Sequence, residues 1–139
     1  MRCACAHAQR MTSMIVVDAS AVIEALLRTP AAAAVDARLF EPGETLLAPH
    51  LLDVEVAQVI RHYVAIGDID ANRGREALDD FADLRLRRYP HDWLLPRIWE
   101  LRHDLTAYDA VYVALAAPLL TRDSGLAAAA GLRAKIELF

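Results

Sequence analysis

Short runs of β-branched and leucine residues alternate along the chain with longer segments whose apolar residues recur at helical spacing. The short runs predict buried strands, and one alternating arginine-rich run is typical of an edge strand. The expected strands cover residues 15–17, 45–47, 85–88, 118–121 and 135–139. The expected helices cover residues 19–28, 31–40, 49–66, 70–84, 91–103, 106–117 and 124–130. Strands separated by helical crossovers indicate an α/β fold, a parallel sheet with helices on both faces.

Four acidic residues occupy positions from which this fold would bring them together. Asp18 and Asp123 each follow an expected strand, and ligands bind where the carboxyl ends of parallel strands meet. Glu55 lies inside an expected helix, and Asp109 is the only charge in the segment 106–117. A carboxylate among apolar residues is costly unless it is paired or binds a cation. With no basic residue as an evident partner, the four acids predict a metal site.

Three of these acids also have an ordinary explanation as helix caps. Asp18 and Asp123 each precede an expected helix, where a side-chain oxygen can accept from a backbone N–H. Thr106 and Asp109 have the spacing of a capping box. A cap and a metal ligand can occupy one position, because helix N-termini also attract negative charge.

Glu55 has no such explanation, because it lies deep in a helix where no cap is needed. It shares a helix face with apolar residues, so its carboxylate requires a partner. One alternative is an ion pair with Arg61 or Arg28. The other is a cation shared with the remaining three acids, which accounts for all four together.

A ligand set made only of oxygens suits a hard cation, Mg²⁺ or Mn²⁺, rather than zinc. Such an ion acidifies bound water into a nucleophile and stabilises negative charge on phosphate. Ser20 and Thr121, each two residues from an acid, are either local caps or groups that orient water or phosphate. The predicted catalytic and metal-binding residues are Asp18, Glu55, Asp109 and Asp123.

Size and charge narrow the possible functions. The 139 residues suit one domain, and no apolar stretch reaches the ~18 residues that a membrane span requires. A net charge of −4 argues against a protein that coats DNA, but not against an enzyme whose acids bind metal. Fourteen of the 15 basic residues are arginine, five of them between residues 85 and 102. This cluster is either a rim that binds phosphate or a solvated face that balances nearby acids.

The first 13 residues differ from the rest. They contain both cysteines, Cys3 and Cys5, but complete neither a disulfide framework nor a zinc site. They lack the apolar core of a secretory signal, so we expect a disordered extension before a domain spanning residues 14–139. Reduced thiols and no export signal favour the cytoplasm.

The segments around the four acids resemble the PIN-domain proteins, and the small size is similar to that of the VapC toxins of bacterial toxin–antitoxin pairs. The resemblance covers residues 14–139 and rests on the segments 16–21, 105–116 and 120–123 together with Glu55. It implies a three-layer α/β/α domain with a central parallel sheet. It also implies a ribonuclease specific for single-stranded RNA and dependent on Mg²⁺ or Mn²⁺. The metal-binding acids carried over by motif are Asp18, Glu55, Asp109 and Asp123.

The resemblance further implies a homodimer and a VapB-type antitoxin whose C-terminal segment inserts near the active site. The connection before Pro118 is shorter than is usual in the family, which keeps open a PIN-like module that has lost catalysis and only binds a partner. A third possibility is a receiver-type phosphoacceptor domain. Receivers need an acidic pair after the first strand and a late lysine, whereas Asp18 is followed by Ala19 and Ser20, and Lys135 is the only lysine.

Overall fold

A computed structural model describes residues 13–115, 119–121 and 136–138. Its strands form one sheet in the order β3-β2-β1-β4-β5, and each neighbouring pair is parallel. The parallel α/β arrangement predicted from the sequence is therefore confirmed. The strands are β1 (Ser13–Val17), β2 (Glu44–Pro49), β3 (Leu86–Tyr89), β4 (Leu119–Thr121) and β5 (Ile136–Leu138).

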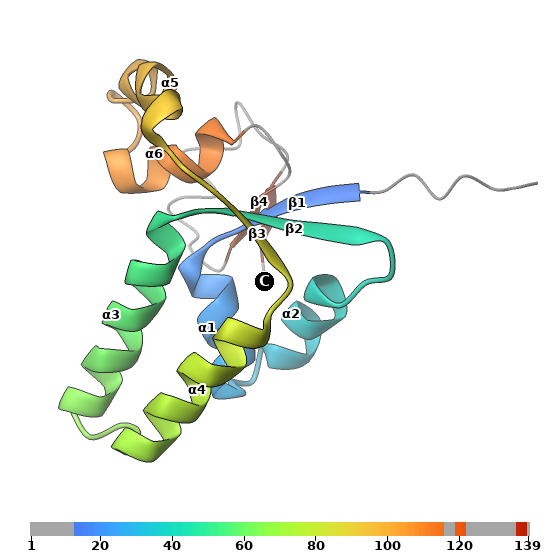
Figure 1. Cartoon of the computed structure of the whole chain (residues 1–139), viewed down its shortest axis with the longest axis vertical. Helices are drawn as coiled ribbons and strands as arrows, with labels where there is room; N and C mark the ends of the chain where they lie inside the picture. The colour runs from blue at the N-terminus through green and yellow to red at the C-terminus, as the bar shows by residue number, and fades with distance from the viewer. Residues whose placement is uncertain (1–12, 116–118, 122–135, 139) are drawn as a thin grey trace, which may run out of the picture.

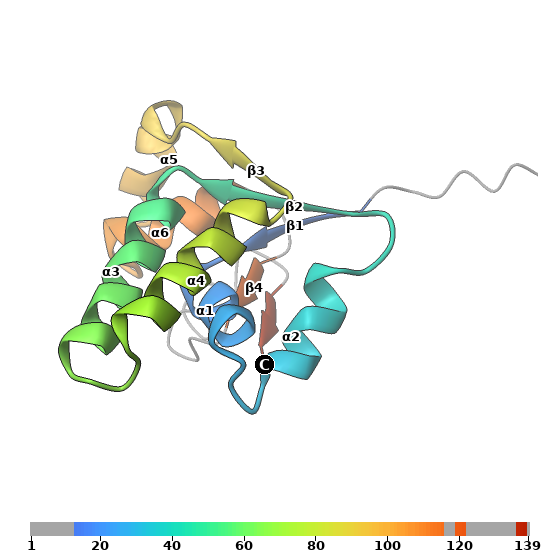
Figure 2. The ribbon, with the colours of Figure 1, turned by 60° about the horizontal axis from the view of Figure 1, so that its bottom comes forward.

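Helices cover both faces of this sheet (Figures 1 and 2). From β1 to β2 to β3 the chain moves across the sheet in one direction, so right-handed crossovers place α1 to α4 on one face. The return from β3 to β4 reverses the direction, which places α5 and α6 on the other face. The helices are α1 (Ala19–Leu27), α2 (Ala32–Leu39), α3 (Leu51–Ala65), α4 (Ala71–Asp83), α5 (Leu95–Glu100) and α6 (Ala107–Ala114), with a 3₁₀ turn at Asp92–Leu94.

The reversal of direction falls between β1 and β4, the central pair of strands. The helix after β1 and the helix before β4 lie on opposite faces. The carboxyl edge of the sheet therefore opens between them, the usual ligand position in such folds. β1 itself is anchored in the core, since Ile15, Val16 and Val17 have no exposed surface. No helix in the described ranges is both long and apolar enough to cross a membrane.

Two predicted helix boundaries were wrong, and each involves a proline. Pro49 does not start a helix: it is the last residue of β2, and helix α3 begins at Leu51. A proline is tolerated at a strand end, where its missing N–H breaks no ladder bond. The expected helix 91–103 is a 3₁₀ turn followed by the short α5, with Pro96 in its first turn. Proline fits a helix start but not a helix interior, so α5 begins there.

Helix α1 ends at Arg28, whose φ of 55° and ψ of 45° place it in the left-handed region. This conformation turns the chain so that the Arg28 N–H donates to the carbonyl oxygen of Glu24. The Thr29 N–H donates to the same oxygen, with a nitrogen–oxygen distance of 3.3 Å. Arg28 thus closes the helix where glycine is the usual residue.

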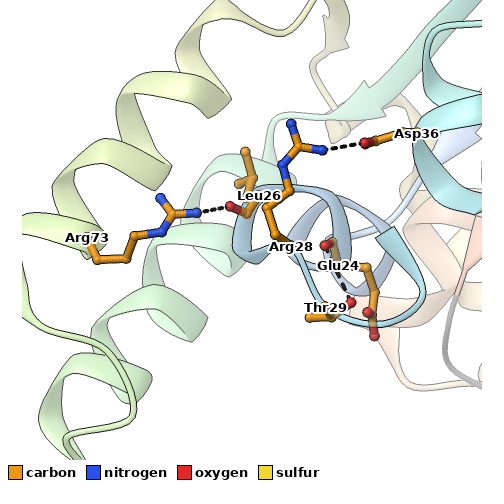
Figure 3. A network of polar contacts seen from close by, with 6 residues as sticks. All are labelled: Glu24, Leu26, Arg28, Thr29, Asp36 and Arg73. Carbon is orange, nitrogen blue, oxygen red and sulfur yellow. Dashed lines mark hydrogen bonds and ion pairs between the residues drawn. The ribbon is translucent and has the colours of Figure 1, made fainter. Parts of the chain in front are cut away.

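Side chains connect this helix end to both neighbouring helices (Figure 3). Arg73 of α4 donates to the carbonyl oxygen of Leu26, which the helix leaves without an intrahelical partner. The Arg28 guanidinium lies 2.5 Å from the carboxylate of Asp36 in α2. The C-terminus of α1 is therefore held in place from two sides, while its N-terminus lies at the carboxyl edge of the sheet.

The left-handed Arg28 yields a prediction for stability. Both Arg28→Gly and Arg28→Ala remove the ion pair to Asp36, which contributes little because the Arg28 side chain is 72% exposed. Only glycine relieves the steric cost of the positive φ, so Arg28→Gly should be more stable than Arg28→Ala by about 1 kcal/mol. Denaturant unfolding of the two variants measures this difference. An alanine variant as stable as the glycine variant would show that the backbone carries no such cost.

Candidate active site

Asp18 follows β1 directly and caps α1. Its Oδ1 accepts from the Ala21 N–H at 3.1 Å and from the Ser20 hydroxyl at 2.7 Å. The residue is buried, with 5% of its surface exposed. The predicted cap is confirmed, and Ser20 donates to the acid. The positive end of the α1 dipole favours a carboxylate at this position, at the edge of the sheet.

Glu55 is half-buried in the second turn of α3, and its Oε2 accepts a hydrogen bond from the Tyr112 hydroxyl of α6. The two arginines considered as partners are engaged elsewhere. Arg61 donates to the side chain of Gln58 at 3.0 Å, and Arg28 pairs with Asp36. The ion-pair alternative for Glu55 was therefore wrong, and a neutral phenol takes that place.

Asp109 is half-buried in the first turn of α6. Its backbone N–H donates to the hydroxyl of Thr106 at 3.3 Å, which confirms the Thr106 half of the predicted capping box. The positive end of the α6 dipole stabilises its carboxylate, as α1 does for Asp18.

Asp18 and Asp109 both act electrostatically on Glu55. Burial raises the pKa of Glu55, the hydrogen bond from Tyr112 opposes that rise, and the charges of Asp18 and Asp109 add to it. Burial also raises the pKa of Tyr112, and its bond to Glu55 raises it further. Tyr112 is consequently a neutral donor at physiological pH. The structure thus brings three of the four predicted acids within electrostatic range, from the ends of three elements.

The donor set at this edge fits a hard divalent cation in its chemistry. All three side chains offer carboxylate oxygens. Burial raises the pKa of Glu55 most, and a cation would relieve the further rise that the charges of Asp18 and Asp109 cause. Among the described residues, no three Asp, Glu, His or Cys side chains are close enough to enclose one ion together. Mg²⁺ does not require this, because it keeps several waters and takes one or two carboxylates directly. The metal-binding role of these acids stays a prediction, and Asp123 lies outside the described residues.

A groove of about 410 Å³ opens beside Glu55. Ala19 of α1 and Tyr108 of α6 line it together with one face of α3. Its walls are mostly apolar, with Glu55 and Gln58 as the polar groups from α3. Glu55 is therefore accessible to a ligand from the side of the groove.

The contact of Tyr112 with Glu55 was not predicted from the sequence. Tyr112 is in the core, with 2% of its surface exposed. A buried tyrosine hydroxyl usually finds a partner, and Tyr112 lies one helical turn after Asp109. These two signals point to a partner near the acids, although they do not identify Glu55.

Two arginines of the cluster at residues 85–102 pair with acids. Asp53 accepts from the Arg88 Nε with both carboxylate oxygens, at 2.7 and 3.0 Å. Arg97 pairs with Glu100 at 2.6 Å. Three large aromatic side chains are mostly exposed and lie outside the core of this chain: Trp93 (60%), Trp99 (68%) and Tyr108 (66%).

Similar sequences cover nearly the whole chain. Ribonuclease VapC1 of Mycobacterium tuberculosis is 47% identical over 128 residues, which are 88% of this chain and 96% of the relative. Ribonuclease VapC12 of the same species is 44% identical over 129 residues, or 90% and 98% of the two chains. No family model matches the chain.

Two solved structures share the fold. PAE2754 from Pyrobaculum aerophilum aligns with a TM-score of 0.65 and 25% identity, over 91% of this chain and 84% of that one. VapBC2 from Rickettsia felis, solved with a DNA fragment from its promoter, aligns with a TM-score of 0.66 and 14% identity, over 90% and 98%. The second likeness concerns the fold alone.

The raised pKa of Glu55 predicts how Glu55→Gln changes stability with pH. In the folded protein the pKa lies above the ordinary 4.5, so ionising Glu55 destabilises the fold. The free energy of unfolding of metal-free wild type should therefore fall relative to that of Glu55→Gln as the pH rises from 4.5 through the raised pKa of Glu55. At neutral pH the variant should melt at an equal or higher temperature. Thermal melts in EDTA across this range measure the difference, and a wild type that gains on the variant with rising pH would contradict the assignment.

Proposed function

Because the chain belongs to the VapC family of PIN-domain ribonucleases, we propose that it is the toxin ribonuclease of a toxin–antitoxin pair and hydrolyses phosphodiester bonds of RNA. The observation that carries this proposal is the meeting of Asp18, Glu55 and Asp109 at the carboxyl edge of the sheet. Relatives named ribonucleases at 44–47% identity support the reaction class.

The proposed cofactor is Mg²⁺ or Mn²⁺, held by Asp18, Glu55 and Asp109, with Asp123 as a fourth ligand proposed from the sequence alone. When bound, the ion supplies an acidified water and positive charge beside the scissile phosphate. Carboxylates alone would repel a phosphodiester, so a nuclease site built from acids requires a cation. The repulsion that Asp18 and Asp109 exert on Glu55 supports this assignment.

The chain's own residues provide the positioning. The N–H of Ala21 and the hydroxyl of Ser20 fix the carboxylate of Asp18. Helix α6 holds Asp109 in its first turn, where Thr106 caps the helix. The groove beside Glu55 gives an extended strand access to this acid, and its apolar walls suit unstacked bases better than a duplex. Single-stranded RNA is therefore the proposed substrate.

The remaining parts of the proposal rest on the family. A solved relative in fold is a VapBC assembly, which supports a VapB-type antitoxin as the partner of this chain. A homodimer and a cytoplasmic location are proposed on the same basis. A PIN-like module without catalysis has no specific support, because none of the three described acids is replaced.

The first prediction from this proposal concerns metal dependence. The purified protein should cleave single-stranded RNA with Mg²⁺ or Mn²⁺, stop in excess EDTA and resume when the ion is returned, because its ligands are all oxygens. A gel assay on a single-stranded RNA shows this, with the same sequence annealed into a duplex as the control. Cleavage that survives the chelator would contradict the metal mechanism.

Asp109→Asn tests whether Asp109 is more than a helix-capping acid. Asn is nearly isosteric, so a capping role predicts a small loss of stability and full activity. A ligand role predicts a loss of turnover of about 100-fold or more. Mutation of a residue that only supports a metal ligand already lowers metal affinity or activity by about 10- to 100-fold. Melting in EDTA should be unchanged or higher, because repulsion is relieved.

Asp70→Asn is the matched control, since the Asp70 carboxylate caps α4 by accepting from the Arg73 N–H at 2.8 Å. It should keep wild-type turnover. Equal turnover of Asp109→Asn and Asp70→Asn would return Asp109 to a structural role.

A further inference from the structure

Tyr112 links the two helical layers at the site by a hydrogen bond. Its hydroxyl, on α6, donates to the Oε2 atom of Glu55, on α3, across 57 residues of sequence. Helices α3 and α6 lie on opposite faces of the sheet (Figures 1 and 2). The hydrogen bond therefore joins two helices that are far apart in the sequence and meet only in the folded protein.

The bond engages only part of Glu55. A carboxylate has two oxygens and about four lone-pair sites, so one phenolic donor on Oε2 leaves Oε1 available. Tyr112 is buried at 2% exposure, which restricts its rotamer, whereas a half-buried glutamate has several rotamers available. The rigid partner therefore sets the position of the flexible one.

Repulsion gives Glu55 a reason to move without this donor. Asp18 and Asp109 both act on its carboxylate electrostatically, and the groove beside α3 offers water to a side chain that turns away. Tyr112 follows Asp109 by one turn of α6, so the two side chains share a helix face. One turn of α6 thus carries Asp109 and also Tyr112, the hydrogen-bond donor to Glu55.

We propose that Tyr112 is a positioning residue of the active site, which fixes Glu55 beside Asp18 and Asp109 and thereby sets the affinity of the acids for a divalent cation. This inference rests on the proposed metal-dependent function. The competing explanation is that the Tyr112 hydroxyl is a buried polar group and Glu55 merely satisfies it. The two explanations differ in what happens to metal affinity when the hydroxyl is removed.

Tyr112→Phe removes the hydroxyl and keeps the ring that fills the core. Mn²⁺ binding to the full chain, measured by electron paramagnetic resonance of the free ion, should weaken about 10- to 100-fold, the range expected for the partner of a metal ligand. The Mn²⁺ concentration that half-activates RNA cleavage should rise with it. Tyr63→Phe is the matched control, because it removes a half-buried tyrosine hydroxyl from α3 and should leave both values at wild type.

A double-mutant cycle with Glu55→Gln establishes whether Tyr112 acts through Glu55. If it does, Tyr112→Phe should have little further effect on Mn²⁺ affinity once Glu55 is already Gln. An additive effect would overturn the proposal. So would an unchanged Mn²⁺ dissociation constant in Tyr112→Phe, whether or not its melting temperature in EDTA falls.

Wild type is the reference that separates this inference from the proposed function. If wild type binds Mn²⁺ and cleaves RNA while Tyr112→Phe binds Mn²⁺ equally well, the role of Tyr112 alone is overturned. A wild type that neither binds Mn²⁺ nor cleaves RNA overturns the metal-dependent function and the inference with it.

Discussion

Repulsion between carboxylates at one edge of a parallel sheet is the constraint on which the site depends. Burial raises the pKa of Glu55, and the charges of Asp18 and Asp109 raise it further. The fold compensates each charge locally. Asp18 and Asp109 stand at the positive ends of α1 and α6, and Glu55 receives a hydrogen bond from a neutral phenol.

The strand order explains why these residues meet. Reversal of direction between β1 and β4 separates the helices onto two faces and leaves the carboxyl edge open between them. Asp18 comes from the end of β1, Glu55 from the helix after β2, and Asp109 from the helix before β4. The hydrogen bond from Tyr112 to Glu55 connects α6 and α3 across this edge. The fold thereby concentrates charge where a phosphodiester substrate would have access.

Local signals in the sequence were enough to predict much of this site. Asp18 after an apolar run identified both a strand end and a cap, and Thr106 with Asp109 identified a helix start, because these effects act within a few residues. The contacts of Glu55 with Tyr112 and of Asp53 with Arg88 escaped prediction, because they join residues 57 and 35 positions apart. Such pairs depend on how helices and strands cross, which no local pattern specifies. The metal-binding role of the acids, Asp123 among them, stays a prediction.

The central claim is that the acids at the sheet edge share a divalent cation, and anomalous diffraction from a crystal soaked in Mn²⁺ tests it most directly. We expect an anomalous peak at the carboxyl edge between β1 and β4. Oxygens of Asp18, Glu55 and Asp109 should bind that ion directly or through its waters, with direct bonds of about 2 Å. Mn²⁺ bound only at other acids, or a site left empty at saturating Mn²⁺, would contradict the account.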